Sequence, residues 1–317
     1  MFRQFKKNML QLIWRKIMEN LPKFLIEMLN AQYGNEIAKQ MIQGYFAKRK
    51  TTLRVNTIKT DISSVTNEFD ERKIEYEKVP WSQEALILKR ADEKEIQELE
   101  IYEKGEIYLQ SLSSMLPPII LNPKPNTDIL DMAAAPGGKT TQMAALTQNK
   151  AHITACEMNS IRAERLKYNV EKQGASSVYV MQADSRKMDD FFAFDSILLD
   201  SPCSGSGTLN AKDENLAKRF TPKLIEKSTK SQITLLRKAM KILKTGQEMV
   251  YSTCSILACE NEEIVSQILK EAKAEIVPIE FSGMEHLPIL PVKIKGTLCI
   301  CPNEFFEGFF VAKIRRK

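Results

Sequence analysis

The stretch TDILDMAAAPGGKTTQ (127–142) decides the fold of this chain of 317 residues. Its first half is an apolar run of strand length, and its second half enters a helical pattern through Pro136, Gly137 and Gly138. Glycines at such a turn let the backbone approach a ligand closely, at the place where α/β sheets bind nucleotides. The stretch does not contain G-x-G-x-x-G, and it lacks the first glycine of the G-x-x-x-x-G-K-[ST] triphosphate motif. An ordinary glycine-containing turn is the alternative.

Strands and helices alternate for most of the chain after residue 105. Apolar runs of strand length lie at 152–158, 178–184, 194–201 and 248–255. Helical patterns lie between them, for example at 160–174 and 231–246. This alternation predicts a parallel, doubly wound α/β sheet. Two later runs, TLCICP (297–302) and FEGFFVAKI (306–314), predict a terminal antiparallel hairpin, an arrangement that resembles the class I (Rossmann-like) methyltransferase fold.

The first hundred residues have a different character. Apolar residues recur at helical spacing over 4–46 and are interrupted by Pro22 and Gly34, which predicts short helices. The segment that follows reads strand, helix, strand, strand, which predicts a small α+β module. We therefore predict an N-terminal helical and α+β module over 1–104 and a Rossmann-like domain over 105–317.

Composition restricts the class of protein. Hydrophobic residues make up 43% of the chain and charged residues 27%, as in ordinary globular proteins. The apolar runs are too short to span a bilayer, and the N-terminal stretch has scattered charges, unlike a secretory signal. Six cysteines are too few for a disulfide scaffold. We expect a cytoplasmic monomer with no membrane or metal partner.

Basic charge is segregated within the net charge of +6. Residues 1–50 contain ten Lys or Arg against three Glu, and residues 211–245 contain ten basic residues against three acidic ones. Segregated positive charge attracts polyanions, of which nucleic acid is the usual one. These two segments and the basic residues of the tail (313–317) are candidates for an RNA path, with solvated helix faces as the alternative.

Three carboxylates end three consecutive predicted strands after the glycine turn: Glu157, Asp184 and Asp200. The carboxyl ends of parallel strands meet at one edge of the sheet, where ligands bind. Glu157 is placed to accept hydrogen bonds from both ribose hydroxyls of an adenosine-containing cofactor, and Asp184 to face the adenine. Three carboxylates would repel a pyrophosphate but not the cationic sulfonium of S-adenosylmethionine. Helix caps or solvated turns are the alternative for any one of them.

Cys203 in DSPCSGSG (200–207) and Cys254 in YSTCSILACENEE (251–263) each follow a strand at the same expected edge. A disulfide between them is the main alternative, and a reducing cytosol argues against it. Zinc is disfavoured because there is no C-x-x-C pair and the two histidines are remote. The other four cysteines are expected to be small buried residues.

Two thiols beside an S-adenosylmethionine site suggest methylation of a cytosine. The C5 carbon takes up a methyl group only after a thiolate has added to C6 and turned the ring into an enamine. The C5 proton must then leave before the thiolate can depart, which needs a base near the opposite ring carbon. Asp200 can hydrogen-bond N3 and the exocyclic amine.

Four motifs together resemble the RNA (cytosine-5)-methyltransferase family of NSUN, RsmB and Sun proteins. They are DMAAAPGGKTTQ (131–142), DSPCSGSGT (200–208), YSTCSILACENEE (251–263) and EGFFVAK (307–313). LRVNTIK (53–59) and YLQSLSSMLPPIIL (108–121) match upstream elements of the family. The resemblance implies S-adenosyl-L-methionine-dependent methylation of cytosine C5 in RNA, rRNA in the first place or tRNA, and an RRM-like N-terminal part that binds the RNA.

The resemblance also implies roles for single residues. Cys254 would attack C6, and Cys203 would assist proton removal and release. Lys139 would brace the site. The family's cofactor contacts fall on Ala133, Ala134, Ala135, Pro136, Gly137, Gly138, Lys139, Glu157, Asp184 and Asp200. One position departs from the pattern, because Asn303 stands where the family more often has a histidine.

Other functions stay open at the level of the sequence. A DNA cytosine-5 methyltransferase would use Cys203 as its nucleophile and carry a large target-recognition region after the core, which we do not expect in the short segment after residue 255. A non-catalytic RNA-binding assembly factor of the same fold would not be expected to keep both cysteines and all three acids. A nicotinamide dehydrogenase is disfavoured by the missing G-x-G-x-x-G.

Overall fold

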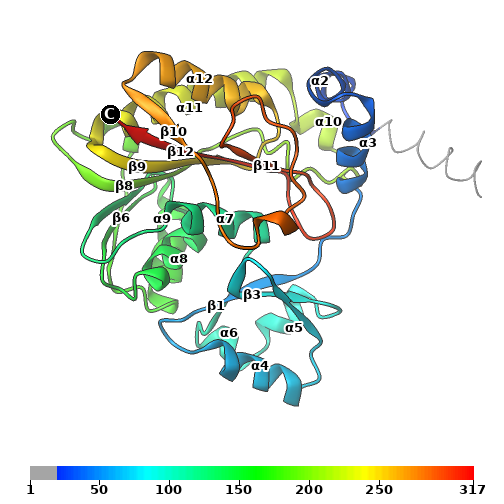
Figure 1. Ribbon diagram of the computed structural model, residues 1–317. Helices are drawn as coiled ribbons and strands as arrows, with labels where there is room; N and C mark the ends of the chain where they lie inside the picture. Colours follow the sequence, from blue (N-terminus) through cyan, green and yellow to red (C-terminus); the bar gives the residue numbers. More distant parts are fainter. Residues whose placement is uncertain (1–19) are drawn as a thin grey trace, which may run out of the picture.

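The computed structural model describes residues 20–317, which form two sheets and the helices packed on them (Figure 1). The larger sheet has the strand order β10-β12-β9-β8-β5-β6-β7, with β11 paired to β12. Its parallel core consists of β5 (Asp128–Asp131), β6 (His152–Cys156), β7 (Val178–Met181), β8 (Phe194–Asp200) and β9 (Leu243–Thr253). The order of these strands reverses at β5, so the end of β5 is the point where doubly wound sheets bind ligands.

The terminal hairpin is present as predicted. β12 (Phe309–Arg316) pairs antiparallel with β11 (Leu298–Ile300) and inserts, also antiparallel, between β9 and β10 (Ala274–Val277). Phe310 of β12 lies opposite Thr253, and Arg315 lies opposite Glu248. The first residues of β12 therefore lie at the carboxyl ends of the parallel strands, and its last residues lie at the opposite edge.

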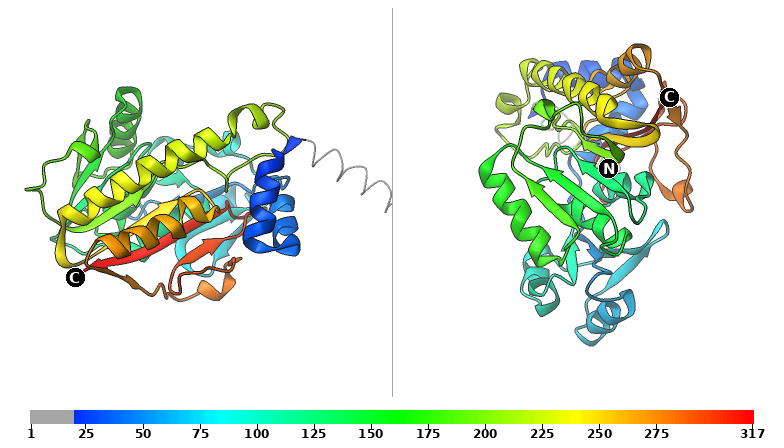
Figure 2. Two further views of the ribbon diagram at one scale, coloured as in Figure 1. Left: turned by 90° about the horizontal axis from the view of Figure 1, so that it is seen from above. Right: turned by 90° about the vertical axis from the view of Figure 1, so that its left-hand side faces the viewer.

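Helices cover both faces of the large sheet. One face carries α7 (Leu112–Leu121), α8 (Gly138–Leu146) and α9 (Ser160–Lys172), below the sheet in Figure 1. The other carries α11 (Pro222–Ile242) and α12 (Glu262–Glu271), which run side by side in Figure 2. The short α10 (Leu216–Arg219) precedes α11.

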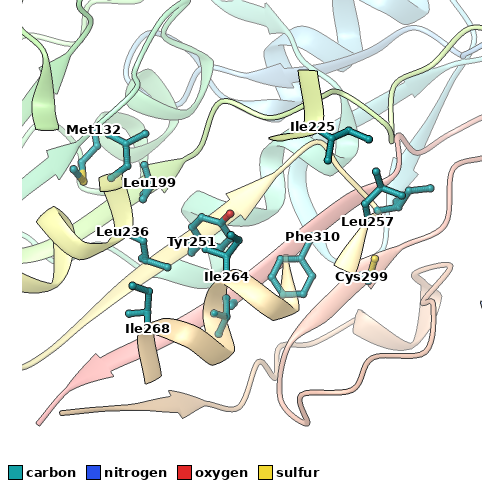
Figure 3. Packing of buried hydrophobic residues seen from close by; sticks show 14 of the residues in the cluster. Met132, Leu199, Ile225, Leu236, Tyr251, Leu257, Ile264, Ile268, Cys299 and Phe310 are labelled. Carbon is teal, nitrogen blue, oxygen red and sulfur yellow. The ribbon is translucent and has the colours of Figure 1, made fainter. Parts of the chain in front are cut away.

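The core beneath α11 and α12 is built from the apolar faces of helix and strand. Tyr251 and Phe310 from the sheet meet Leu236 of α11 and Ile264 and Ile268 of α12 (Figure 3). All five are almost fully buried. Removal of this apolar surface from water is the main force that holds the layers together.

The two N-terminal helices in the described part of the chain pack against the same core. α2 (Lys23–Tyr33) begins after Pro22, and Gly34, with φ of +77°, separates it from α3 (Asn35–Gly44), as the sequence predicted. Leu29 and Met41 are fully buried in the cluster that also contains Tyr251. The helix predicted before Pro22 lies outside the described residues.

The small sheet has the order β2-β3-β1-β4 and is antiparallel throughout. Its elements follow one another as β1 (Thr52–Val55), α4 (Ile62–Glu71), β2 (Tyr76–Val79), β3 (Ser82–Leu88), α5 (Glu93–Gln97), α6 (Glu100–Glu103) and β4 (Ile107–Leu109). This β-α-β-β-α-β succession is the ferredoxin-like arrangement and confirms the small α+β module. Trp81 packs against Phe306, with ring centroids 6.4 Å apart, and so ties the module to the large domain.

The structure differs from the sequence prediction in two details, and one further prediction is not tested. The strand β10 was not predicted, because its four residues are all half-buried and show no alternation. The helix predicted over 231–246 begins at Pro222 and ends at Ile242, and Gly246, with φ of +79°, lies within β9. The division at residue 104 stays a prediction, although β4, which follows it, pairs with β1 of the small sheet.

Candidate active site

The glycine turn lies between β5 and α8. Gly137 is the residue before α8 and has φ of +112°, a left-handed conformation that favours glycine. A Cβ atom on Gly138 would lie 3.0 Å from the ring of Tyr108, which comes from β4 of the small sheet. The turn is therefore held between the large sheet and the ferredoxin-like module.

Two of the predicted acids line a cavity of about 630 Å³ beside this turn. They are Glu157, at the end of β6, and Asp184, after β7. Arg162 of α9 lies 3.3 Å from the Glu157 carboxylate, and Arg186 donates two hydrogen bonds of 2.8 Å to Asp184. The hydrogen bonds from Arg186 hold the pKa of Asp184 below its ordinary value, so its carboxylate is ionised at neutral pH. Neither arginine was predicted from the sequence.

A second cavity, a cleft of about 550 Å³, lies on the other side of the turn. Ala133 borders both cavities. Cys254, Lys139 and Asp200 line the cleft from the large domain, and Tyr108 lines it from the small module. The structure thus brings the predicted nucleophile and the predicted brace together at the cleft, next to the cavity that holds the other two acids.

Lys139 and Asp200 form an ion pair at the base of the cleft, with 2.8 Å between Nζ and Oδ2. Lys139 also donates to the hydroxyl of Ser114 at 2.6 Å, and Ser252 donates to Asp200 at 2.7 Å. Burial alone would lower the pKa of Lys139, but the charge of Asp200 and its hydrogen bond raise it above its usual value. Lys139 therefore stays charged and fixes the Asp200 carboxylate, as expected for a brace.

The two predicted active-site thiols lie side by side. The sulfur atoms of Cys203 and Cys254 are 3.2 Å apart, and both cysteines are free, so the alternative of a disulfide is not realised. The hydrogen bond to Cys254, burial, and the charges of Cys254 and Glu260 raise the pKa of Cys203 well above its usual value. Cys203 therefore holds a proton that it can donate to the sulfur of Cys254.

A buried carboxylate joins the two cysteine loops. Glu260, with no exposed surface, accepts hydrogen bonds from the backbone N–H and the hydroxyl of Ser204 at 2.7 and 2.5 Å. It also accepts one from the hydroxyl of Ser255 at 2.7 Å, and Ser255 hydrogen-bonds Ser206 at 2.7 Å. Glu260 thus links the residue after Cys203 to the residue after Cys254, a role that was not predicted from the sequence.

Two glycines let the loops approach each other. Gly207 donates its N–H to the carbonyl of Cys254 at 2.9 Å, and Gly308 donates its N–H to the carbonyl of Gly207 at 2.8 Å. A Cβ atom on Gly207 would lie 1.9 Å from the carbonyl oxygen of Gly308. A Cβ atom on Gly308, the glycine of the EGFF motif, would in turn lie 2.7 Å from the Cα of Gly207, so both glycines are required for this close backbone packing.

The N-terminal helices support both cysteine loops. Tyr33 and Gln32 donate to the carbonyl of Ile256 at 2.8 and 3.0 Å, on the Cys254 side. Tyr45 donates to the carbonyl of Ser206 at 2.7 Å, on the Cys203 side. These aromatic and amide side chains were not predicted as site residues, because their partners are remote in the sequence.

Arg49, which belongs to the basic segment 1–50, contacts backbone carbonyls of the chain itself. Arg49 donates to the carbonyls of Asn303 and Phe306. The side-chain oxygen of Asn303 accepts hydrogen bonds from the N–H groups of Phe305 and Phe306, at 2.8 Å each. Arg49 and Asn303 therefore shape the loop that carries Phe305 into the wall of the cleft, so Arg49 is not a free cation.

The basic tail lies away from this site. Lys313 and Arg315 form ion pairs with Glu248, and Lys317 pairs with Glu275. Arg315 lies opposite Glu248, which pairs with Ser196 near the start of β8, so these charges are at the edge of the sheet remote from Cys254. The tail therefore does not line the cleft, and its part in an RNA path stays a prediction.

Among residues 20–317, no group of three or more His, Cys, Asp or Glu side chains is arranged to hold a metal ion. Within the same residues, no helix is both long and apolar enough to cross a membrane.

Together, the doubly wound sheet and the glycine turn define a Rossmann-like methyltransferase fold with an N-terminal ferredoxin-like domain. Residues 118–315 match the family model described as 16S rRNA methyltransferase RsmB/F, and residues 21–93 match the ferredoxin-like domain described for RsmF/B-like methyltransferases. The chain belongs to the RsmB/F methyltransferase family, which confirms the resemblance identified in the sequence.

Relatives of known name are similar over most of this chain. Ribosomal RNA small subunit methyltransferase F of Shewanella loihica is 34% identical over 91% of the chain, which spans 63% of that relative. The probable ribosomal RNA small subunit methyltransferase B of Bacillus subtilis is 30% identical over 93% of the chain, which spans 66% of it. The tRNA (cytosine(49)-C(5))-methyltransferase of Pyrococcus abyssi is 34% identical over 84% of the chain, which spans 88% of it. The chain thus spans less than two thirds of the two rRNA relatives.

Solved structures agree with this assignment. A methyltransferase homolog protein from Pyrococcus horikoshii has a TM-score of 0.83 and 30% identity, covering 96% of this chain and 98% of its own. The structure of NSun6 from the same organism, solved with SFG, has a TM-score of 0.83 and 25% identity, covering 93% of this chain and 98% of its own.

Proposed function

We propose that this chain transfers a methyl group from S-adenosylmethionine to C5 of a cytosine in RNA, through a covalent bond between Cys254 and C6. The observation that carries the proposal is the pair of free thiols, 3.2 Å apart, of which Cys254 lines a cleft that shares Ala133 with a carboxylate-lined cavity. The names of the rRNA and tRNA methyltransferases among the relatives support an RNA substrate.

The cavity beside the glycine turn fits S-adenosylmethionine by size and by its donor set. Its volume of about 630 Å³ is in the range of small-molecule sites. Glu157 and Asp184 are acceptors for hydroxyl and amine donors. In the adjoining cleft, which the residues of the turn line, Asp131 has a buried oxygen that finds no hydrogen-bond partner among the described residues. SFG, seen with NSun6, is an analogue of the same cofactor. We propose that the cofactor is held by Ala133, Ala134, Ala135, Pro136, Gly137, Gly138, Lys139, Glu157, Asp184 and Asp200.

In the proposed reaction, the thiolate of Cys254 attacks the cytosine and forms a bond between its sulfur and C6. Asp200, fixed by Lys139, accepts a hydrogen bond from the exocyclic amine and so holds the ring against Cys254. The electrons of the C5–C6 double bond become available at C5. When bound, the cofactor supplies a sulfonium methyl group that C5 takes up, leaving a neutral thioether.

Cys203 completes the cycle. Once Cys254 is bonded to C6 it carries no charge, so its contribution to the raised pKa of Cys203 is removed, while burial and Glu260 remain. Cys203 then loses its proton to solvent and accepts the C5 proton as a thiolate. The electrons of the C5–H bond re-form the C5–C6 double bond, and the C6–S bond breaks and returns Cys254 as a thiolate.

A groove of about 610 Å³ next to the cleft is the proposed path of the RNA strand. It runs between α3, the end of β3 and the loop around Phe305, and it shares Lys50 and Phe305 with the cleft. We call four of its cations, Lys48, Lys50, Lys89 and Arg90, the basic groove. Lys48 is exposed, and Lys50 donates to the carbonyl of Lys89 at 2.9 Å. Within residues 20–317, the ion pairs of Lys89 and Arg90 are exposed, at 3.6 and 3.5 Å, and contribute little. These charges are available for phosphates.

Small-subunit rRNA is the substrate we propose first and tRNA second, and we place the activity in the cytoplasm because both substrates and reduced thiols are found there. The test uses total RNA, tritiated S-adenosylmethionine and bisulfite sequencing. The proposal expects label at a defined cytosine, loss of label in Cys254→Ala, and full label in Cys259→Ala, a matched half-buried cysteine away from the cleft. Label in tRNA alone would make tRNA rather than rRNA the substrate. Undiminished label from Cys254→Ala would overturn the mechanism.

A further inference from the structure

Glu260, which lies near the thiols, is an unusual carboxylate because it is fully buried. It lies at the end of the short helix η2 (Ala258–Glu260) and has no exposed surface. None of the ion pairs formed within residues 20–317 includes it. A buried carboxylate without a cation is costly to maintain, and it is kept only where hydrogen bonds satisfy it.

Its hydrogen bonds are divided between the two cysteine loops. The carboxylate accepts hydrogen bonds from the backbone N–H and the hydroxyl of Ser204 and from the hydroxyl of Ser255, at 2.5 to 2.7 Å. The serines directly follow Cys203 and Cys254 in the sequence. Glu260 therefore acts as a clamp whose length sets how closely the two loops, and with them the two sulfur atoms, approach.

The two thiols have different electrostatic surroundings. Cys203 faces the carboxylate of Glu260, the phenol of Tyr251 and the sulfur of Cys254, all of which are acidic groups. Cys254 lines the cleft together with the ion pair of Lys139 and Asp200. The cation of Lys139 is close enough to Cys254 for a negative charge on that sulfur to raise the pKa of Lys139. A negative charge beside one sulfur and a positive charge near the other make the two sulfurs unequal as acids.

We propose that Glu260 is the positioning residue that gives the two thiols different roles: it clamps their loops through Ser204 and Ser255, and its negative charge opposes a second negative charge on Cys203. The inference rests on the proposed function for what the thiolate then attacks. The inequality of the two thiols does not depend on RNA or cofactor, so it is measured without either.

The experiment measures alkylation of each cysteine by iodoacetamide as a function of pH, with peptide mass spectrometry to separate the sites. In the wild-type chain, Cys254 should react at lower pH than Cys203. Glu260→Gln keeps the size and one acceptor oxygen, replaces the other oxygen by an N–H2 donor toward which a serine hydroxyl can turn its oxygen, and removes the charge. The midpoint for Cys203 should therefore fall by about one pH unit, a tenfold faster reaction below the midpoint. The gap between the two midpoints should narrow accordingly.

Glu262→Gln is the matched control. Glu262 is also buried, lies two residues further on, and accepts backbone hydrogen bonds from Lys293 and Ile294 rather than from the cysteine loops. Both variants should melt at lower temperature than the wild type, but only Glu260→Gln should move the profile of Cys203. The proposal is overturned if the Cys203 profile is unchanged in Glu260→Gln, or if Glu262→Gln moves it equally. Should Glu260→Gln not fold, the wild type still decides, because Cys203 reacting at lower pH than Cys254 contradicts the proposal.

Discussion

The two edges of the large sheet carry similar residues but differ in what they can do. At the carboxyl edge, Lys139 pairs with Asp200 beside a cleft of about 550 Å³. At the opposite edge, Lys313 and Arg315 pair with Glu248 beside a cavity of about 420 Å³. Only the carboxyl edge adds the glycine turn and the two thiols. Charge and a cavity therefore do not by themselves define a site, whereas the convergence of strand ends does.

The largest contrast is expected between the two lysines. Lys139→Met leaves Asp200 without its cation, so the carboxylate that should orient the cytosine is no longer fixed. We expect a loss of about 100- to 1000-fold in kcat, the usual effect of removing one fixed electrostatic group. Lys313→Met, at the opposite edge, should change kcat by less than about threefold, because it removes only a partly exposed ion pair. Single-turnover methyl transfer measures both, and equal losses would break the distinction between the edges.

A second contrast uses two glycines. Gly207→Ala places a Cβ atom against the backbone of Gly308 and should destabilise the chain by about 3 kcal/mol while separating the cysteine loops. Gly246→Ala, at the opposite edge, meets open space and should destabilise it by only about 1 kcal/mol, from its positive φ. Urea unfolding gives both values. A Gly207→Ala variant as stable as Gly246→Ala would show that the close approach behind the thiols is not required.

A third contrast concerns two glutamates. Glu157→Ala removes the acceptor proposed for the ribose hydroxyls and should weaken S-adenosylmethionine binding about 10- to 100-fold, the effect of losing hydrogen bonds to a charged group. Glu248→Ala should leave the affinity unchanged although it frees two cations. Isothermal titration calorimetry with and without EDTA measures the affinity. A signal that disappears with EDTA would point to a metal and contradict the proposed site.

The smallest effect is expected from the cations. Lys48→Glu with Arg90→Glu, in the basic groove, should reduce the slope of log affinity against log salt for a single-stranded oligoribonucleotide by about 0.7 for each phosphate that is no longer neutralised. Arg315→Glu with Lys317→Glu, at the opposite edge, should leave that slope unchanged. Fluorescence anisotropy over a salt series measures it. An equal change in both double variants would mean that binding follows net charge and not the groove.

Much of the fold could be predicted because its signals are local. The apolar run before Gly137 and the turn after it specify β5 and α8, and the alternation that follows specifies the parallel sheet. β10 could not be predicted because its four half-buried residues have neither an apolar run nor a period of two. Gly246 was misread as a helix end, because a glycine with positive φ occurs in irregular strands as well as after helices.

The candidate site also contains residues that could be predicted from the sequence and residues that could not. Glu157, Asp184 and Asp200 could be placed at one edge because parallel strands end together. Glu260 and Tyr33 could not be assigned roles, because Ser204, which Glu260 joins to Ser255, and Ile256, the partner of Tyr33, lie 56 and 223 residues away in the sequence. The residues proposed to carry the chemistry could thus be placed at one edge from the sequence, whereas the residues that position them could not.

The proposed mechanism depends on Cys254 attacking and Cys203 releasing, and one denaturing gel distinguishes these roles. Purified Cys203→Ala and Cys254→Ala are incubated with cytosine-containing RNA and S-adenosylmethionine, and protein–RNA adducts that survive SDS are quantified. Cys203→Ala should accumulate an adduct because methyl transfer proceeds and elimination fails, whereas Cys254→Ala should form none. An adduct from Cys254→Ala but not from Cys203→Ala would contradict the assignment and favour the order of roles expected of a DNA cytosine-5 methyltransferase.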